Sequence, residues 1–350
     1  MKMNKYKMIN ITNFAVCVIG AVSVSAAVIY GCDVACKKSF VRVEDYQVAE
    51  EEKVPVRDYT IDNYDTDFWK LNIYDPVEYA EASANVTSFS ENLVAKGAIL
   101  VDCDSKEIIY EKNSNQMMAP ASTTKLATAI TAVNLFDEDE EIVVGNEVNL
   151  IASDSSKAGF EKGEKLTFKE LLQGMLLSSG NDAAYIIAKA GGEKLLDDNI
   201  AYEDKEITIE QCVKRFVYEM NKNVYDIGAM NTNFTTPDGY DDAQQYTTAK
   251  DLSKIAMIAL QNKQLKEIFA MTKAKVKNHE FTTTNELLLK DSSFFYKYAI
   301  GMKTGSTGAA GKCLVSAASK DNRTCICVVL NSDTEGRYED SLKLLHFFQE

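Results

Sequence analysis

Three short motifs rich in serine, lysine and threonine occur in one order along the chain. They are Ser122-Thr-Thr-Lys125, Ser179-Gly-Asn181 and Lys303-Thr-Gly305. Together they supply a hydroxyl nucleophile, amines that can take its proton, and a segment that can hold a peptide. The chain has only two histidines, so a Ser-His-Asp mechanism has little to draw on. The chemistry that these residues could perform is therefore serine acyl transfer with a lysine base.

The first motif places a serine and a lysine three residues apart. On a helix, residues at this spacing share one face with about 5–6 Å between their Cβ atoms, so Lys125 Nζ can reach Ser122 Oγ. Ser122 could instead be an ordinary N-cap, but a capping box would place Glu or Gln at position 125. The positive helix end disfavours a lysine there by roughly 0.3–1 kcal/mol, and with burial it lowers the lysine pKa. We therefore expect Lys125 to act as the base.

Each of the other two motifs also has an ordinary structural interpretation. Ser179-Gly180-Asn181 fits a turn between helices that ends on a glycine, or a proton-relaying serine beside an amide that donates to a substrate carbonyl. Lys303-Thr-Gly305 fits a bulged edge strand with a solvated lysine, or an edge to which an extended peptide adds. The conjunction favours the functional interpretation, because the three elements together are the serine set of the penicillin-recognising enzymes.

The N-terminal region has an apolar segment, which is followed by an acidic one. Residues 8–32 contain no charged side chain and follow three lysines. This length exceeds the ~7–15 residues of a secretory h-region and reaches the about 20 of a membrane-spanning helix. We expect residues 1–32 to form a membrane anchor. A cleaved signal peptide and a lipid-modified Cys32 are the alternatives, and all three would export the rest of the chain.

Residues 33–92 are expected to form an acidic linker. Residues 44–91 contain 13 acidic side chains against three basic ones, which is −10 of the net charge of −14. A solvated spacer is the simplest interpretation of such a stretch. The acidity argues against nucleic acid as a partner, because nucleic-acid binding needs a basic face.

The cysteines and histidines do not indicate a metal site. No set of them has the spacing of zinc ligands. Three of the eight cysteines, Cys313, Cys325 and Cys327, lie in apolar runs that are typical of strands, where a small buried side chain is the usual role. We expect neither a metal ion nor a cofactor.

The elements that must position the motifs are predicted over residues 93–350. Strands at both ends of this region with helices between them indicate one α+β domain with a sheet of about five strands. A capping box at Thr167 marks the start of the second helix, and Gly191-Gly192 is expected to end the third, which Asp182 can cap. The strands are expected at 97–102, 107–110, 299–304, 312–318 and 324–331, and the helices at about 122–135, 168–177, 182–192, 209–227, 249–260 and 339–348.

From about Ala95 to Phe348 the sequence resembles the low-molecular-mass D-alanyl-D-alanine carboxypeptidases, the S11 serine peptidase family of penicillin-binding proteins. The resemblance implies a β-lactamase/transpeptidase-like fold, an antiparallel sheet flanked by helices with an inserted helical subdomain. It is carried by Pro120-Ala-Ser-Thr-Thr-Lys125, Leu176-Leu-Ser-Ser-Gly-Asn-Asp-Ala-Ala184, Met220-Asn221, Asn231-Thr-Asn-Phe234, Thr247-Thr-Ala249 and Gly301-Met-Lys-Thr-Gly305.

The same resemblance implies the roles of the site residues. Ser122 would attack the carbonyl between two D-alanines, Lys125 would take its proton, and Ser179 would assist proton transfer. Backbone N–H groups of Ser122 and Ser306 would form the oxyanion hole. The residues implied in substrate binding are Asn181, Lys303, Thr304, Gly305, Ser306 and Thr307.

Two departures from the family pattern are visible. Thr284 precedes Asn285 at a point where some relatives carry an arginine near the substrate carboxylate, so the detail of carboxylate recognition is open. The sequence also ends at Glu350, so we expect it to lack the all-β C-terminal domain and amphipathic anchor of many members. The N-terminal segment would then provide any attachment to the membrane.

We expect a serine D-Ala-D-Ala carboxypeptidase that trims peptidoglycan stem peptides and is inhibited covalently by β-lactams. Its expected location is the extracytoplasmic face of the bacterial cell membrane, or the cell wall after secretion. A D,D-endopeptidase acting on cross-links is a close alternative. A non-catalytic cell-wall-binding module is a more distant one, because binding does not require an activated nucleophile. A β-lactamase shares the three motifs, but no Glu-x-x-Leu-Asn segment lies between Asn181 and Lys303.

Overall fold

The computed structural model of the chain describes residues 75–80, 89–197 and 207–348. The expected anchor or signal at 1–32 lies outside the described residues, as does most of the expected linker at 33–92. No helix in the described part has both the length and the apolar character needed to cross a membrane. The expectations about membrane attachment and export therefore stay predictions.

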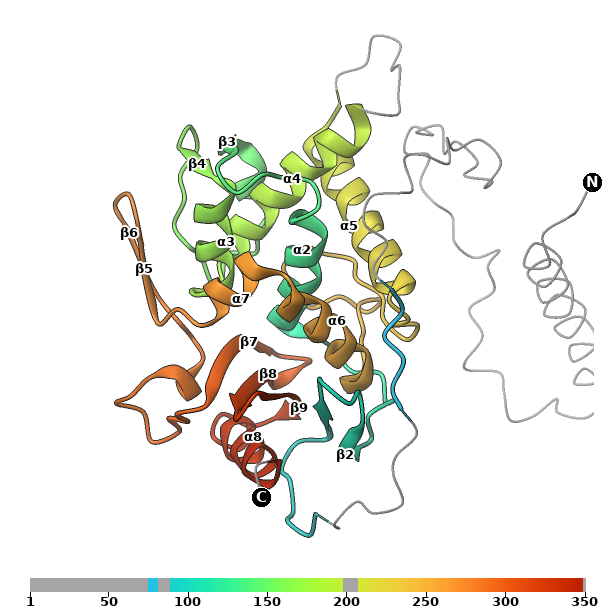
Figure 1. Ribbon diagram of the computed structural model, residues 1–350. Helices are drawn as coiled ribbons and strands as arrows, with labels where there is room; N and C mark the ends of the chain where they lie inside the picture. The colour runs from blue at the N-terminus through green and yellow to red at the C-terminus, as the bar shows by residue number, and fades with distance from the viewer. Residues whose placement is uncertain (1–74, 81–88, 198–206, 349–350) are drawn as a thin grey trace, which may run out of the picture. The chain divides into compact units, whose positions relative to one another are not determined.

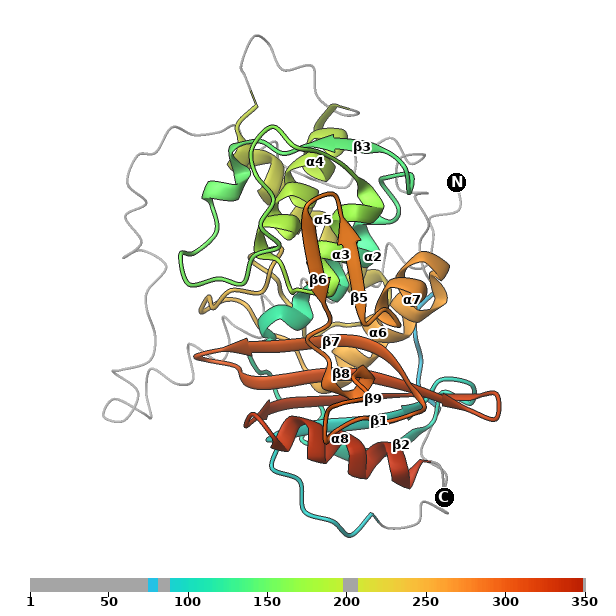
Figure 2. The same cartoon turned by 90° about the vertical axis from the view of Figure 1, so that its left-hand side faces the viewer.

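A five-stranded antiparallel sheet combines both ends of the described chain. Its order is β2-β1-β9-β8-β7, so the first hairpin joins the C-terminal strands through β9, and β7 lies at an edge (Figures 1 and 2). This confirms the predicted sheet. The strands are β1 Gly97–Asp102, β2 Ile108–Lys112, β7 Ala299–Thr307, β8 Gly311–Lys320 and β9 Arg323–Ser332.

Alternate residues of each inner strand point to opposite sides of the sheet, so the sheet has two faces with buried side chains, and helices cover both of them. Ile99 and Val101 of β1 enter the core that the sheet shares with most of the helices. Ala98 and Leu100 enter a second core under helix α8, Gly336–Phe347. Figure 2 shows α8 on one side of the sheet and the other helices on the opposite side. The five described cysteines are all free, and the three in β8 and β9 are buried as small hydrophobic side chains.

The remaining helices lie between β2 and β7 in the sequence, as predicted for an inserted helical part. At its centre is α2, Lys125–Ala132, in which every residue is buried. The capping box at Thr167 is present and opens α3. The others are α3 Phe168–Leu176, α4 Asn181–Asp197, α5 Ile209–Asp226, α6 Ala249–Gln261 and α7 Lys263–Phe269.

The predicted end of the third helix is wrong. Helix α4 continues through Gly191 and Gly192 to Asp197. A Cβ on Gly192 would lie 1.9 Å from the carbonyl oxygen of Cys212, and one on Gly191 would lie 2.6 Å from the Phe216 ring. The two glycines therefore allow α4 to pack closely on α5 and do not end the helix.

Two small two-stranded sheets were not predicted. One joins β3, Glu141–Val143, to β4, Lys165–Thr167. The other joins β5, Lys273–Val276, to β6, His279–Thr282, and lies against the helical part (Figure 2). The strands have only three or four residues, which is too short for a clear alternation of polar and apolar side chains.

Candidate active site

The serine and lysine of the first motif are in contact. Ser122 lies in a 3₁₀ turn, Ala121–Thr124, and Lys125 is the first residue of the buried helix α2. Lys125 Nζ is 2.9 Å from Ser122 Oγ. The contact predicted from the three-residue spacing is therefore confirmed. Because the segment begins as a 3₁₀ turn, the α-helix starts three residues later than Ser122.

Lys125 is fully buried, and its amine contacts three oxygen atoms. Besides Ser122 Oγ, it donates to Asn181 Oδ1 at 2.7 Å and to the backbone oxygen of Asp238 at 2.7 Å. Burial lowers the pKa of Lys125 to about 8, although the carboxylates of Asp238 and Asp182 act in the opposite direction. A lysine with this pKa has an appreciable neutral fraction near neutral pH, and the neutral amine can accept the Ser122 proton.

The second motif lies in the turn between α3 and α4. Ser179 has a φ of +60°, and Gly180 N donates to Gly174 O across the end of α3. Asn181 Oδ1 accepts from Lys125, so Asn181 Nδ2 is left as a donor. Ser179 as a residue is 7% exposed, and its hydroxyl makes no hydrogen bond to a described residue. Asn181 thus contacts Lys125 of the Ser122–Lys125 pair directly. Ser179 makes no hydrogen bond to either residue and is connected to the pair only as a near neighbour of Asn181 in the sequence.

Lys303 of the third motif is buried behind the edge strand. Its side chain has no exposed surface, which rules out the interpretation as a solvated lysine. Its amine donates to Thr304 O at 2.9 Å. Burial holds the pKa of Lys303 well below its usual value, and the charges of Lys125 and Arg337 act in the same direction.

The two glycines of β7 allow the chain's own backbone to approach. A Cβ on Gly305 would lie 3.1 Å from Ala121 Cβ and 3.2 Å from Pro120 O. Gly301, in the bulge at the start of β7, has a φ of +114°, and a Cβ there would lie 2.0 Å from Phe269 O. Gly305 therefore lets the edge strand pack against the turn that carries Ser122.

The hydroxyls along β7 have separate partners. Thr304 Oγ1 is 2.6 Å from the hydroxyl of Thr284, the residue that departs from the family pattern. Ser306 Oγ accepts from Lys312 at 2.7 Å, and Thr307 Oγ1 accepts from the backbone of Ala310 at 3.1 Å. The position at which the family pattern allows an arginine therefore carries Thr284, and its uncharged hydroxyl pairs with that of Thr304.

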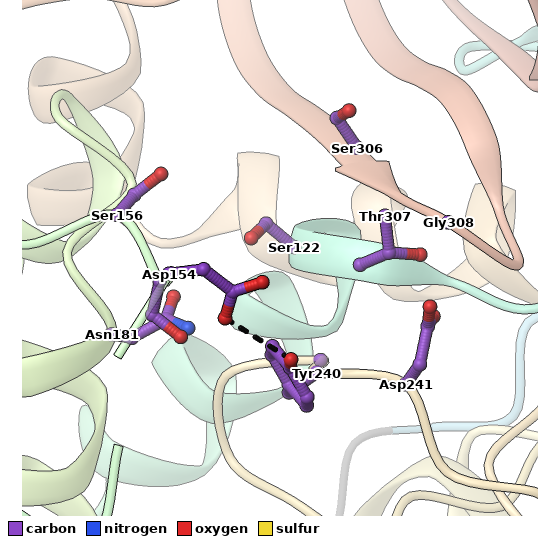
Figure 3. Close-up of a pocket in the computed structure, with 11 residues that line it drawn as sticks. Ser122, Asp154, Ser156, Asn181, Tyr240, Asp241, Ser306, Thr307 and Gly308 are labelled. Atoms are coloured by element: carbon purple, nitrogen blue, oxygen red, sulfur yellow. Dashed lines mark hydrogen bonds between the residues drawn. The ribbon is translucent and has the colours of Figure 1, made fainter. Parts of the chain in front are cut away.

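A pocket opens in front of Ser122, and only some of the predicted residues line it (Figure 3). Lys125, Ser179, Lys303, Thr304 and Gly305 are not among the lining residues. The lining consists of the predicted Ser122, Asn181, Ser306 and Thr307, with Asp154, Ser155, Ser156, Gly239, Tyr240, Asp241 and Gly308 in addition.

Two loops that were not predicted to belong to the site form the pocket walls. Residues 154–156 form the first wall, and residues 239–241 form the second. Gly239 has a φ of +86°, and a Cβ there would lie 1.9 Å from Ala121 O. Its loop therefore packs directly on Ala121–Thr124, the turn that carries the candidate nucleophile Ser122 and is called the nucleophile turn below. Tyr240 Oη donates to Asp154 Oδ1 at 3.1 Å and thereby connects the two walls. Pro237 and Gly239 are residue types that are typical of a loop and could have identified the second one from the sequence. No motif marked the first.

Asp182 fixes the first wall from inside the first turn of α4, where its Oδ1 also accepts from Ala183 N at 2.9 Å, and it is not the residue that precedes the helix. Its carboxylate accepts from the backbone N–H groups of Ala158, Gly159 and Phe160 at 2.7–3.2 Å. Asn181 N also donates to Ser156 O at 2.8 Å. The start of α4 therefore carries Asn181 into the site and holds the loop beside it.

No group of three or more His, Cys, Asp and Glu side chains in the described part is arranged to hold a metal ion. The arrangement instead provides a serine hydroxyl, a buried amine of lowered pKa in contact with it, and an amide donor. These are the parts of a nucleophilic acyl-transfer site.

Comparison with known proteins identifies relatives of this arrangement. The family described as D-alanyl-D-alanine carboxypeptidase, Peptidase S11, matches residues 82–196 and 208–334. D-alanyl-D-alanine carboxypeptidase DacF of Bacillus subtilis is 31% identical over 271 residues, which are 72% of this chain and 61% of DacF. The D-alanyl-D-alanine carboxypeptidase of Streptomyces sp. strain K15 is 29% identical over 273 residues, 73% of this chain and 87% of that protein.

Solved structures show the same fold. The Streptomyces K15 DD-transpeptidase superposes with a TM-score of 0.66 at 28% identity and covers 75% of this chain and 100% of its own. Penicillin binding protein 6B from Escherichia coli has a TM-score of 0.67 at 23% identity, with 78% and 82% covered. The match to DacF spans only about three fifths of that relative's length.

Proposed function

Since the chain belongs to the peptidase S11 family of D-alanyl-D-alanine carboxypeptidases, we propose that it removes the terminal D-alanine from peptidoglycan stem peptides. One observation carries the proposal. Lys125 Nζ, buried and of lowered pKa, lies 2.9 Å from Ser122 Oγ at a pocket bordered by the free edge of β7.

Acylation begins with the neutral amine of Lys125. It accepts the Ser122 proton while Ser122 Oγ attacks the carbonyl carbon of the D-Ala-D-Ala bond. The backbone N–H groups of Ser122 and Ser306 stabilise the oxyanion. The carbon–nitrogen bond then breaks, the leaving amine takes a proton from the Lys125 ammonium, and D-alanine departs. Water hydrolyses the ester in the second half, with the amine again receiving and returning a proton.

The substrate is held as an added strand along the edge of β7. Asn181 Nδ2 is the donor for a substrate carbonyl, because Asn181 Oδ1 already accepts from Lys125. The paired hydroxyls of Thr284 and Thr304 face the terminal carboxylate. Ser179 and Lys303 complete the proton-transfer set. A β-lactam mimics the peptide and acylates Ser122, and the enzyme acts outside the cytoplasmic membrane, to which its N-terminal segment attaches it.

A fluorescent penicillin and a pentapeptide ending in D-Ala-D-Ala test the proposal together. We expect the full chain to become labelled and to release D-alanine, and Ser122→Ala to lose both activities by at least about 10³-fold, because the nucleophile is gone. Labelling that survives Ser122→Ala would refute the assignment of Ser122 as the nucleophile. Labelling of the wild type without release of D-alanine would instead favour the endopeptidase or a cell-wall-binding module.

A further inference from the structure

Two acidic side chains line the pocket in front of Ser122, while the amines of Lys125 and Lys312 contact its Ser122 and Ser306 hydroxyls without belonging to the lining. Asp154 projects from one wall and Asp241 from the other, and none of the eleven residues that line the pocket is basic (Figure 3). Each carboxylate uses one oxygen for a hydrogen bond. Asp154 Oδ1 accepts from Tyr240 Oη at 3.1 Å, and Asp241 Oδ2 accepts from Ala309 N at 2.9 Å. The second oxygen of each makes no hydrogen bond within the described structure.

The strand direction shows which part of a peptide would meet these carboxylates. Gly305 packs on the nucleophile turn, so the reacting carbonyl lies beside Gly305 and Ser306. A peptide that pairs antiparallel with β7 then places its preceding residue toward Thr307 and Gly308, since a strand advances about 3.3 Å per residue. Asp241 lies beside this end of β7, because it holds the N–H of Ala309.

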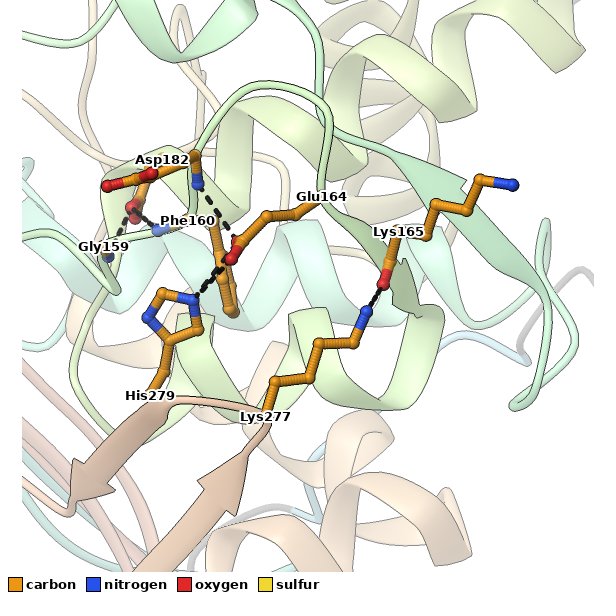
Figure 4. Close-up of polar contacts among 8 residues, drawn as sticks. Gly159, Phe160, Glu164, Lys165, Asp182, Lys277 and His279 are labelled. Carbon is orange, nitrogen blue, oxygen red and sulfur yellow. Dashed lines mark hydrogen bonds and ion pairs between the residues drawn. The ribbon is translucent and has the colours of Figure 1, made fainter.

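The wall that carries Asp154 is fixed in place before any ligand binds. Asp182 accepts from three consecutive backbone N–H groups of this loop, at Ala158, Gly159 and Phe160, and Figure 4 shows the contacts with Gly159 and Phe160. Ser155 Oγ, on the same wall of the pocket, is buried without a hydrogen-bond partner. The wall therefore presents one free carboxylate oxygen, that of Asp154, which can accept from a donor in the pocket.

We propose that Asp154 and Asp241 select peptides in which the residue before the D-Ala-D-Ala pair carries a free side-chain ammonium. This inference rests on the proposed function and names its substrate class. A diamino acid with a free amine brings one positive charge and three donors to the two carboxylates. Acylation of that amine, as in a cross-linked or branched peptide, removes the charge. The preferred substrate is thus the stem peptide that has not been cross-linked through this residue.

Two matched peptides test the selection in the full chain. They are Nα-acetyl-Lys-D-Ala-D-Ala and Nα,Nε-diacetyl-Lys-D-Ala-D-Ala, which differ in the charge of one side chain. We expect kcat/KM for D-alanine release to be higher for the free amine by roughly three- to tenfold, the size expected of two solvent-facing ion pairs. The preference lies in KM and declines when the salt concentration rises, because exposed charges are screened.

Three variants separate charge from structure. Asp154→Asn and Asp241→Asn each keep an oxygen for the existing hydrogen bond and remove only the charge, so each is expected to bring the ratio of the two kcat/KM values toward one. Asp139→Asn removes an exposed charge that does not line the pocket and is expected to keep the wild-type ratio. Circular dichroism melting checks that every variant is folded.

The outcomes distinguish the inference from the proposed function. Release of D-alanine from both peptides at equal kcat/KM, or an unchanged preference in both pocket variants, would overturn the selection and leave the carboxypeptidase intact. A wild type that releases no D-alanine from either peptide would refute the proposed function, and the inference with it.

Discussion

At the scale of single residues, the basicity of Lys125 is a balance between burial and nearby carboxylates. Burial is the larger effect and lowers the pKa to about 8, whereas Asp238 and Asp182 favour the ammonium form. Asp238 is 1% exposed, its backbone oxygen accepts from Lys125, and its Oδ1 accepts from Tyr240 N at 3.1 Å. The carboxylate is therefore held close to the amine by the same loop that walls the pocket.

Replacing Asp238 by Asn should move the pH dependence of acylation. The Asp238 charge raises the pKa of Lys125, so its removal lowers that pKa further. In the proposed mechanism Lys125 acts as the neutral amine, so the rate should rise as the pH passes its pKa, which is about 8 in the wild type. The acid limb of kcat/KM for D-alanine release is therefore expected at lower pH in Asp238→Asn.

The control for this prediction is Asp242→Asn, which removes an exposed charge from the same loop. Its acid limb should coincide with that of the wild type. An acid limb of Asp238→Asn that stays in place, or moves to higher pH, would contradict the role of the Asp238 charge.

At the scale of elements, the start of α4 does two tasks with neighbouring residues. Asn181 contacts Lys125, and Asp182 turns to the other side and binds three N–H groups of the loop at 158–160. The Asp182 side chain is 2% exposed. Because buried N–H groups without acceptors are costly, the loop depends on this carboxylate for its position.

Asp182→Ala is expected to lower the free energy of unfolding by about 2–4 kcal/mol, since hydrogen bonds to a charged acceptor contribute about 1.5–3 kcal/mol each and the freed loop can rebind water. The KM for a D-Ala-D-Ala peptide should rise as well, because the loop forms a wall of the pocket. Urea unfolding and D-alanine release measure the two effects.

Asp182→Asn serves as the comparison, because its amide oxygen can still accept and its loss of stability should be smaller. Equal stability of Asp182→Ala and the wild type, or an unchanged KM, would show that the loop keeps its position without this carboxylate.

At the scale of the whole molecule, the β5–β6 hairpin connects the C-terminal half of the described chain to the helical part beside the pocket (Figure 4). His279 Nε2 is 3.0 Å from Glu164 Oε1, and its ring meets that of Phe160 edge to face at 5.1 Å between centroids. Lys277 Nζ also donates to Lys165 O. Burial raises the pKa of Glu164, but the bonds from His279 and the Glu161 backbone outweigh it and hold that pKa below its ordinary value.

His279→Ala should therefore lower the melting temperature by about 1–10 °C. The contact with Glu164 contributes roughly 0.2–1 kcal/mol and the aromatic contact about 0.5–1.5 kcal/mol, and 1 kcal/mol corresponds to about 2–4 °C in a domain of this size. Differential scanning calorimetry measures the change. His279→Gln, which keeps a donor but loses the ring, should lie between the two. A melting temperature of His279→Ala equal to that of the wild type would show that the hairpin contributes nothing through this contact.

Much of the catalytic arrangement was predictable from the sequence because it depends on local spacing. The contact of Ser122 with Lys125 follows from three residues of helix-like backbone. The capping box at Thr167 is a local signal as well. The strands at both ends of the domain were visible as apolar runs, and the family motifs indicated Asn181, which contacts Lys125 and lines the pocket.

Only the tertiary structure decided which other residues form the pocket and what the glycines are for. Gly192 and Gly239 are required by backbone atoms of Cys212 and Ala121, which lie 20 and 118 positions away in the sequence. Asp154, Tyr240 and Asp241 belong to loops without periodicity, and contacts with Asp182, the nucleophile turn and the end of β7 bring them to Ser122. A local pattern reports which side chains share a turn or a strand face. Contacts between distant segments depend on how the helices and strands pack against one another, and no short stretch of the sequence specifies that packing.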